Sequence, residues 1–159
     1  MRRLSVRSIM TSSVISFKES DSLHKASITL AVNGISGAPV VDEKEHLLGI
    51  LSSMDILRFI KGYKDKMQLD QPALLLAVPM DEDVEDEDLK RAYREISETK
   101  VGEIMTRDVH SVNPDDKLID ALDLMLDKGV RRLPVVEKER VVGIISRKDM
   151  VWAIYRDKA

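Results

Sequence analysis

The most informative stretch of the sequence is GIISRKD, Gly143–Asp149, because an earlier stretch, GILSSMD at Gly49–Asp55, repeats its pattern. Each stretch has a glycine, a short apolar run that predicts a strand, and a Ser-x-x-Asp sequence typical of a helix start. Such a junction brings a hydroxyl, a carboxylate and unpaired backbone N–H groups to one place. The chain therefore contains an internal duplication.

The Ser-x-x-Asp sequence has two interpretations. In the first, the serine and the acid only cap the helix and stabilise its first turn. In the second, the same groups also bind a ligand. The presence of two copies favours the ligand site, because stability alone rarely requires the same junction twice at a fixed place in a repeat.

The duplication extends over most of the chain. Val6–Thr11 corresponds to Val101–Thr106, and Pro39–Val41 corresponds to Pro134–Val136 at the same offset. Each copy reads as a β-α-β-β-α unit, with a first short strand, a helix, two strands joined by a charged turn, and a closing helix. The first strands are expected at Val14–Phe17 and Val109–Val112, the closing helices at Met54–Ile60 and Asp149–Tyr155.

The helix between the first and second strands has an apolar stripe in both copies. In the second copy the stripe is Leu118, Ala121, Leu122, Met125 and Leu126, and in the first it is Leu23, Ala26, Leu30 and Ala31. Each helix starts near an aspartate, Asp21 or Asp116. Gly34 and Gly129 follow the helices, where a residue that tolerates the left-handed conformation ends a helix.

Composition excludes several classes of function. The chain has 159 residues, 43% of them hydrophobic, which predicts a globular protein with one core or two small halves. It has no cysteine and only three scattered histidines, so a thiolate or zinc centre is not expected. The net charge of -3 argues against a generic nucleic-acid binder. The sequence shows neither a signal peptide nor an apolar run long enough to span a membrane, so we expect a cytoplasmic location.

The segment between the copies is the least informative. Leu74–Val78 is apolar but short, and we expect it to pack on the rest of the protein. Asp81–Asp88 contains seven acids, but glycine and glutamate are missing from the positions that an EF-hand calcium loop requires. The acidic run is expected to be a solvated surface, with a basic partner as the alternative, and to lead into a helix at Glu87–Glu98.

In this order and repeated twice, the motifs resemble a tandem pair of CBS domains, the arrangement called a Bateman module. They are Ile-Met-Thr, a helix ending in glycine, Pro-Val-Val, and Gly-apolar-apolar-Ser-x-x-Asp. The resemblance implies an α+β fold of two CBS repeats, residues 1–60 and 101–159, packed sheet to sheet with pseudo-two-fold symmetry. Residues 61–100 would then form a linker with a helix.

The resemblance also implies two clefts that bind adenosine-containing nucleotides. In each cleft the Ser-x-x-Asp helix start would come from one repeat, and the first strand and the residues before proline from the other. Cleft one is expected to contain Ser52, Asp55, Val109, His110, Arg131 and Arg132. Cleft two is expected to contain Val14, Ile15, Ser36, Gly37, Ser146, Arg147 and Asp149.

The chemistry of these residues fits such a ligand. A carboxylate can accept hydrogen bonds from both ribose hydroxyls, and a helix N-terminus with a nearby arginine can bind phosphate. AMP, ADP, ATP and S-adenosylmethionine all remain candidates. For the arginine pair a solvated loop is the alternative, and for His110 a histidine satisfied within its strand.

The resulting prediction is a non-catalytic regulatory module without a metal. A protein-interaction scaffold that has lost its ligand is the alternative. An enzyme is disfavoured because the sequence shows no nucleophile paired with a base, no metal cluster and no phosphate-binding Walker loop. We also expect a regulated protein partner, and a two-fold homodimer through the apolar faces of the closing helices. Those faces comprise Ile56, Leu57, Ile60, Met150, Val151 and Ile154.

Overall fold

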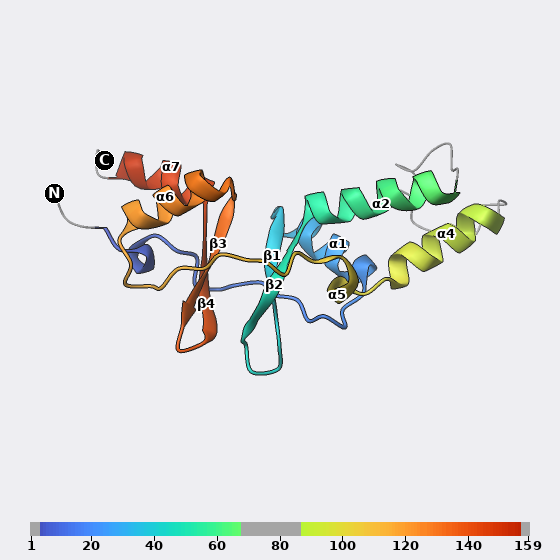
Figure 1. Ribbon diagram of the computed structural model, residues 1–159, viewed down its shortest axis with the longest axis horizontal. Helices are drawn as coiled ribbons and strands as arrows, with labels where there is room; N and C mark the ends of the chain where they lie inside the picture. The colour runs from blue at the N-terminus through green and yellow to red at the C-terminus, as the bar shows by residue number, and fades with distance from the viewer. Residues whose placement is uncertain (1–3, 68–86, 157–159) are drawn as a thin grey trace. The chain divides into compact units, whose positions relative to one another are not determined.

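Two hairpins carry the strands in the computed structural model, which describes residues 4–67 and 87–156. β1 (Gly37–Val41) pairs with β2 (Leu47–Ser52), and β3 (Arg132–Glu137) pairs with β4 (Arg140–Ser146), as Figure 1 shows. The second pair is antiparallel, with Val135 opposite Gly143. Each hairpin joins a helix on both sides in sequence, so the α+β class with two repeats is confirmed.

The described chain divides into two units that do not coincide with the two repeats. The first unit contains residues 4–16, 39–49 and 107–156, and the second contains residues 17–38, 50–67 and 87–106. The chain passes from the second unit to the first along β1 and returns along β2. Each unit therefore combines the core of one repeat with the leading segment of the other.

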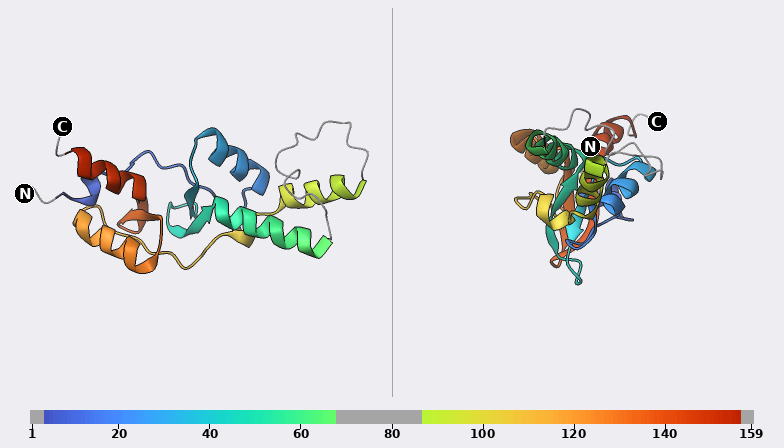
Figure 2. Two further views of the ribbon diagram at one scale, coloured as in Figure 1. Left: turned by 90° about the horizontal axis from the view of Figure 1, so that it is seen from above. Right: turned by 90° about the vertical axis from the view of Figure 1, so that its right-hand side faces the viewer.

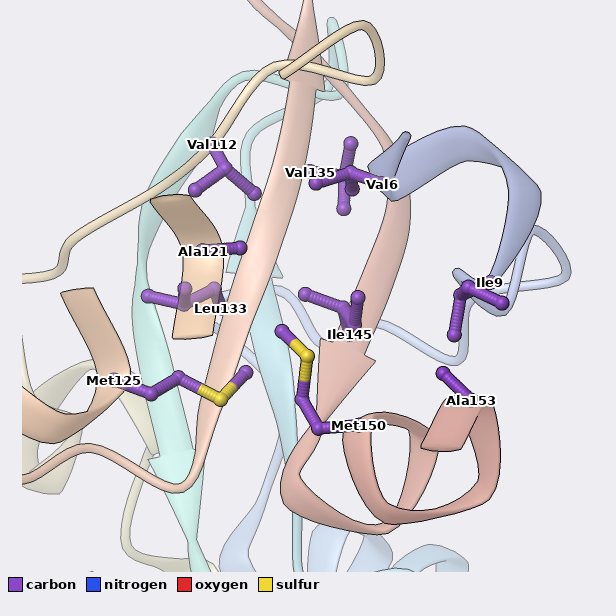
Figure 3. Packing of buried hydrophobic residues seen from close by; sticks show 10 residues of the cluster. All are labelled: Val6, Ile9, Val112, Ala121, Met125, Leu133, Val135, Ile145, Met150 and Ala153. Carbon is purple, nitrogen blue, oxygen red and sulfur yellow. The ribbon is translucent and has the colours of Figure 1, made fainter. Parts of the chain in front are cut away.

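The first unit contains the β3–β4 hairpin, the 3-10 helix η1 (Val6–Ser8), α6 (Leu118–Lys128) and α7 (Arg147–Arg156). Figure 3 shows its apolar core, in which Leu133 and Ile145 extend from the paired strands and Met125 and Met150 from the two helices. α6 ends at Gly129, whose φ of 63° lies in the left-handed region. The predicted helix end is thus confirmed.

The second unit contains α1 (Leu23–Val32), α2 (Ser53–Met67), α4 (Glu87–Glu98) and α5 (Val101–Ile104). α1 packs against both α2 and α4, and its position beside α2 is visible in Figure 2. The Tyr63 hydroxyl on α2 donates a hydrogen bond to the Glu95 carboxylate on α4. Burial, together with this bond, raises the pKa of Tyr63 to about 12.

The leading segments, defined as Val6–Thr11 and Val101–Thr106, pair with the second strand of the opposite repeat. Thr11 exchanges two backbone hydrogen bonds with Ile144, both 2.9 Å, and Thr106 exchanges two with Ile50, also 2.9 Å. These bridges fix each segment to its unit, because strand pairing satisfies backbone groups on both sides. Sequence analysis expected the first strand, and not this leading segment, to join the helix start of the other repeat.

The first strand of each repeat is shorter than predicted. Val112 forms a single parallel bridge with Val135, through hydrogen bonds of 3.1 Å to the Pro134 carbonyl and 2.8 Å from the Val136 N–H. Phe17 is likewise an isolated bridge residue. The rest of Val14–Phe17 and Val109–Val112 is irregular, because a lone bridge does not impose extended geometry on its neighbours.

The structure tests the remaining element predictions. The helix at Glu87–Glu98 is confirmed as α4, and the closing helices exist as α2 and α7. The apolar stripes are confirmed except at their ends, since Leu126 is 68% exposed and Ala31 is exposed. Leu74–Val78 and most of the acidic run lie outside the described residues.

The faces proposed for a dimer are only partly available. Ile56, Ile60 and Met150 are buried, at 5%, 5% and 6% exposure, and belong to the core. Leu57, Val151 and Ile154 are more than half exposed. The expected exposure of the first three residues is therefore wrong, because one face of a helix turns inward and carries residues three or four apart, such as Ile56 and Ile60.

Candidate ligand site

The start of α7 has the geometry of a helix cap built from a hydroxyl and a carboxylate. Oδ2 of Asp149 accepts hydrogen bonds from the Ser146 N–H and the Ser146 hydroxyl, both 2.7 Å. The Ser146 oxygen in turn faces the Asp149 N–H at 3.4 Å. The capping interpretation of Ser-x-x-Asp is confirmed. The cap uses only one of the two carboxylate oxygens of Asp149.

The start of α2 repeats this arrangement. Oδ2 of Asp55 accepts from the Ser52 N–H and the Ser52 hydroxyl, both 2.8 Å, and the Asp55 N–H donates to Ser52 Oγ at 3.2 Å. Here the second oxygen is also engaged, because the Thr106 hydroxyl donates to Asp55 Oδ1 at 3.1 Å. The two helix starts therefore differ at the oxygen that faces away from the cap.

Thr106 was not predicted as a site residue. Its leading segment belongs to the second repeat, yet it reaches the helix start of the first repeat within the second unit. The repeated Ile-Met-Thr motif was the signal that could have identified it. Sequence alone could not place it, because the exchange of leading segments is decided by tertiary pairing.

The residues before each proline lie at the helix start of their own repeat. The Arg147 N–H donates to the Arg131 carbonyl at 3.1 Å in the first unit, and the Ser53 N–H donates to the Ser36 carbonyl at 2.9 Å in the second. The sequence had assigned Arg131 to the cleft of Asp55. The observed hydrogen bond joins its backbone to Arg147, and its place in the cleft of Asp55 stays a prediction.

Ser36, expected in the cleft of Asp149, likewise bonds within its own repeat, and its place in that cleft stays a prediction. Its carbonyl bonds at the start of α2, and Gly37, the first residue of β1, is buried directly after it. Neighbouring strands explain both placements, since residues just before one strand of a hairpin must lie beside the end of the other strand. Arg132 shows this directly, because it pairs with Ser146.

The remaining predicted residues are half-buried and lie in the first unit. Val14 and Ile15 follow the leading segment of the first repeat, and Val109 and His110 precede the Val112 bridge. The first unit thus contains Val14, Ile15, Ser146, Arg147 and Asp149 of predicted cleft two. It also contains four members of cleft one, while Ser52 and Asp55 lie in the second unit. Both clefts as whole sets stay predictions.

The two helix starts differ in charge. Arg131, Arg147 and Lys148 are exposed at the start of α7. Ser36, Ser53 and Met54 occupy the corresponding places at the start of α2 and carry no charge. Because a helix N-terminus already has partial positive charge, the α7 start combines it with full charges and suits an anion.

The part of the chain that the structure describes lacks two other features that would indicate a function. These residues contain no group of three histidine, aspartate or glutamate side chains arranged to hold a metal ion. Among the same residues, no helix is both long enough and apolar enough to cross a membrane.

Comparison with known proteins identifies the repeated unit. The family model for the CBS domain matches residues 6–62 and 101–156. Protein MJ1426 of Methanocaldococcus jannaschii is 30% identical over 152 residues, which cover 94% of this chain and 90% of that protein. An A-adding tRNA nucleotidyltransferase of Aquifex aeolicus is 26% identical, but the chain spans only 15% of its length.

Two solved structures are similar over nearly the whole chain. The CBS domain of a membrane protein from Sphaerobacter thermophilus is 29% identical with a TM-score of 0.72, and the match covers 95% of this chain and 88% of that one. The protein CBSX2, solved in complex with AMP, is 25% identical with a TM-score of 0.72 and 98% coverage of both chains.

Proposed function

Because the chain belongs to the CBS domain family, we propose that it is a non-catalytic regulatory module that binds an adenosine-containing ligand. The structure of the related CBSX2 with AMP supports this class of ligand. The match covers nearly the whole of both chains, so the comparison extends to the helix starts as well as to the strands. AMP, ADP, ATP and S-adenosylmethionine are the candidates for this protein.

The observation that carries the proposal is the free side of the Asp149 carboxylate. Its Oδ2 holds the cap, and its Oδ1 accepts no hydrogen bond from any described residue. A half-buried carboxylate held in one orientation by a cap is suited to accept hydrogen bonds from ribose hydroxyls. Capping and ligand binding are therefore compatible uses of the same side chain.

We assign the binding groups within each unit by the observed hydrogen bonds. Ser146, Arg147 and Asp149 combine with Arg131 at the start of α7, and Ser52 and Asp55 combine with Ser36 at the start of α2. The half-buried Val14 and Ile15, with Val109 and His110, belong to the same unit as the first of these sites, and we assign them to its apolar and polar surface. Adenine can stack on such aliphatic side chains while its edge bonds to backbone groups.

A thermal-shift series with AMP, ADP, ATP and S-adenosylmethionine tests the proposal. A ligand at about 100 times its Kd stabilises the folded state by about 2.7 kcal/mol, which raises the melting temperature measurably. Asp149→Asn preserves the shape of the cap but removes the charge, so it should reduce the shift from its site. Asp123→Asn, an exposed position on α6, is the matched control. If none of the four ligands changes the melt, the scaffold function is supported instead.

The exposed apolar residues support a second proposal, that two copies associate through α2 and α7. Leu57 is 51% exposed, and Val151 and Ile154 are 55% and 63% exposed. Val151 and Ile154 lie three residues apart on α7, and contiguous exposed apolar surface of this kind marks interaction sites. A homodimer with two-fold symmetry would cover each face with its own copy.

A further inference from the structure

The two helix starts are unequal in two independent respects, and this bears on which ligand each one takes. The first concerns the oxygen that a ribose would use. Thr11 and Thr106 occupy the same place in the two leading segments and make the same backbone bridges, to Ile144 and Ile50. Only Thr106 also donates its hydroxyl to the carboxylate beside it.

A ligand at Asp55 must therefore displace a hydrogen bond that a ligand at Asp149 does not meet. This hydrogen bond goes to a carboxylate, but it is exposed and 3.1 Å long, so its net contribution falls to about 0.5–1.5 kcal/mol, which corresponds to about two- to tenfold in affinity. The Thr106 side chain is exposed and can rotate away. The contact thus weakens binding at Asp55 without blocking it.

The second difference concerns charge at equivalent positions. Arg131 and Arg147 meet through the backbone hydrogen bond at the start of α7, and Ser36 and Ser53 meet through the equivalent bond at the start of α2. An arginine can bind a phosphate with two parallel hydrogen bonds, whereas a serine supplies one neutral donor. Two arginines thus stand where the second unit has two serines.

We propose that the two helix starts differ in ligand preference: the α7 start at Asp149 binds a phosphorylated adenine nucleotide tightly, and the α2 start at Asp55 binds adenosine compounds with no preference for phosphate. Binding at Asp55 is the weaker of the two, because the Thr106 hydroxyl competes with the ribose. This division rests on the proposed function, since it assigns ligands to the same two sites.

Titration calorimetry of the full chain with AMP and with adenosine tests the charge difference. The Arg131→Ser/Arg147→Ser variant gives the α7 start the residues of the α2 start. We expect it to weaken the tight AMP event about ten- to hundredfold and to leave adenosine binding unchanged. The reverse exchange, Ser36→Arg/Ser53→Arg, should create a second tight AMP-binding site at the α2 start.

The threonine pair tests the competing hydroxyl. Thr106→Val removes the donor at nearly constant volume and should strengthen adenosine binding about two- to tenfold. Thr106→Ser keeps a hydroxyl, and Thr11→Val changes the equivalent threonine of the other unit, so both should leave adenosine binding unchanged. Thermal melts of each variant show whether it is folded.

Three outcomes overturn the division of ligands. The arginine exchange could weaken AMP and adenosine equally, Thr106→Val could behave like Thr11→Val, or AMP could bind both sites with the same affinity. In each case an adenosine ligand still binds and the proposed function stands. If wild-type protein binds neither AMP nor adenosine, the proposed function fails and the division fails with it.

Discussion

Replacing Gly143 by alanine should loosen the attachment of a leading segment to its unit. Gly143 lies on β4, opposite Val135, where the segment containing Met10 and Thr11 crosses the strand. A Cβ added at Gly143 would lie 2.5 Å from Met10 Sδ, 3.1 Å from Met10 Cγ and 3.1 Å from the Thr11 carbonyl oxygen. The glycine is needed because the segment approaches the strand this closely.

The size of the effect follows from which of these atoms can move. The end of the Met10 side chain is flexible and can turn away with little strain. The Thr11 carbonyl oxygen accepts a hydrogen bond of 2.9 Å from the Ile144 N–H, so it cannot turn away. The backbone at Thr11 must therefore move away from β4 by a few tenths of an ångström. Overpacking of this kind lowers the free energy of unfolding by about 1–3 kcal/mol. We expect about 1–2 kcal/mol, a fall in Tm of roughly 2–8 °C.

Urea unfolding at equilibrium measures this change. Gly62→Ala is the matched control, because Gly62 lies within α2 and, among the described residues outside its own helix backbone, no atom lies within 4 Å of an added Cβ. That substitution should stabilise the protein by about 0.5–1 kcal/mol, since alanine favours the helix. The double variant Met10→Ala/Gly143→Ala should be less destabilised than the sum of the single changes. An unchanged unfolding free energy for Gly143→Ala, or strict additivity with Met10→Ala, would refute the close approach.

Two further predictions concern the helices. Tyr63 should ionise at a pKa of about 12 in the folded protein, above its ordinary value of 10.0, so its contribution to stability is complete below pH 10 and falls as pH rises toward 12. In an ultraviolet titration, the Tyr63→Phe variant should lack this transition, and Glu95→Gln should lower the pKa of Tyr63. A midpoint at the ordinary tyrosine value would contradict the hydrogen bond between Tyr63 and Glu95. Ile154→Glu should convert a dimer to a monomer in sedimentation, whereas Glu139→Lys on the exposed β3–β4 turn should not; monomeric wild-type protein would exclude the proposed dimer.

The helix starts show how far local sequence reasoning reaches. Ser146 with Asp149 and Ser52 with Asp55 form the expected caps, because such a cap involves atoms only three residues apart. For the same reason α4 has the predicted bounds, and Gly129 ends α6. These features depend on backbone propensity and neighbouring side chains, so residues close together in the sequence determine them.

The partners of those helix starts could not be predicted in the same way. The sequence shows that Ile-Met-Thr occurs twice, but it does not say that Thr106 reaches Asp55 or that Arg131 lies beside Arg147. Nor could it separate the buried Ile56 from the exposed Leu57 as possible interface residues.

By itself, the sequence determined the duplication, the order of elements, the family and the residue types at each site. Only the tertiary structure decided that each leading segment joins the other repeat's strands, and hence which oxygen of each aspartate is free. The reason is that pairing between segments far apart in the chain depends on which unsatisfied backbone groups and apolar faces meet. Two repeats with the same pattern offer equivalent partners for that pairing, so only three-dimensional packing selects between them.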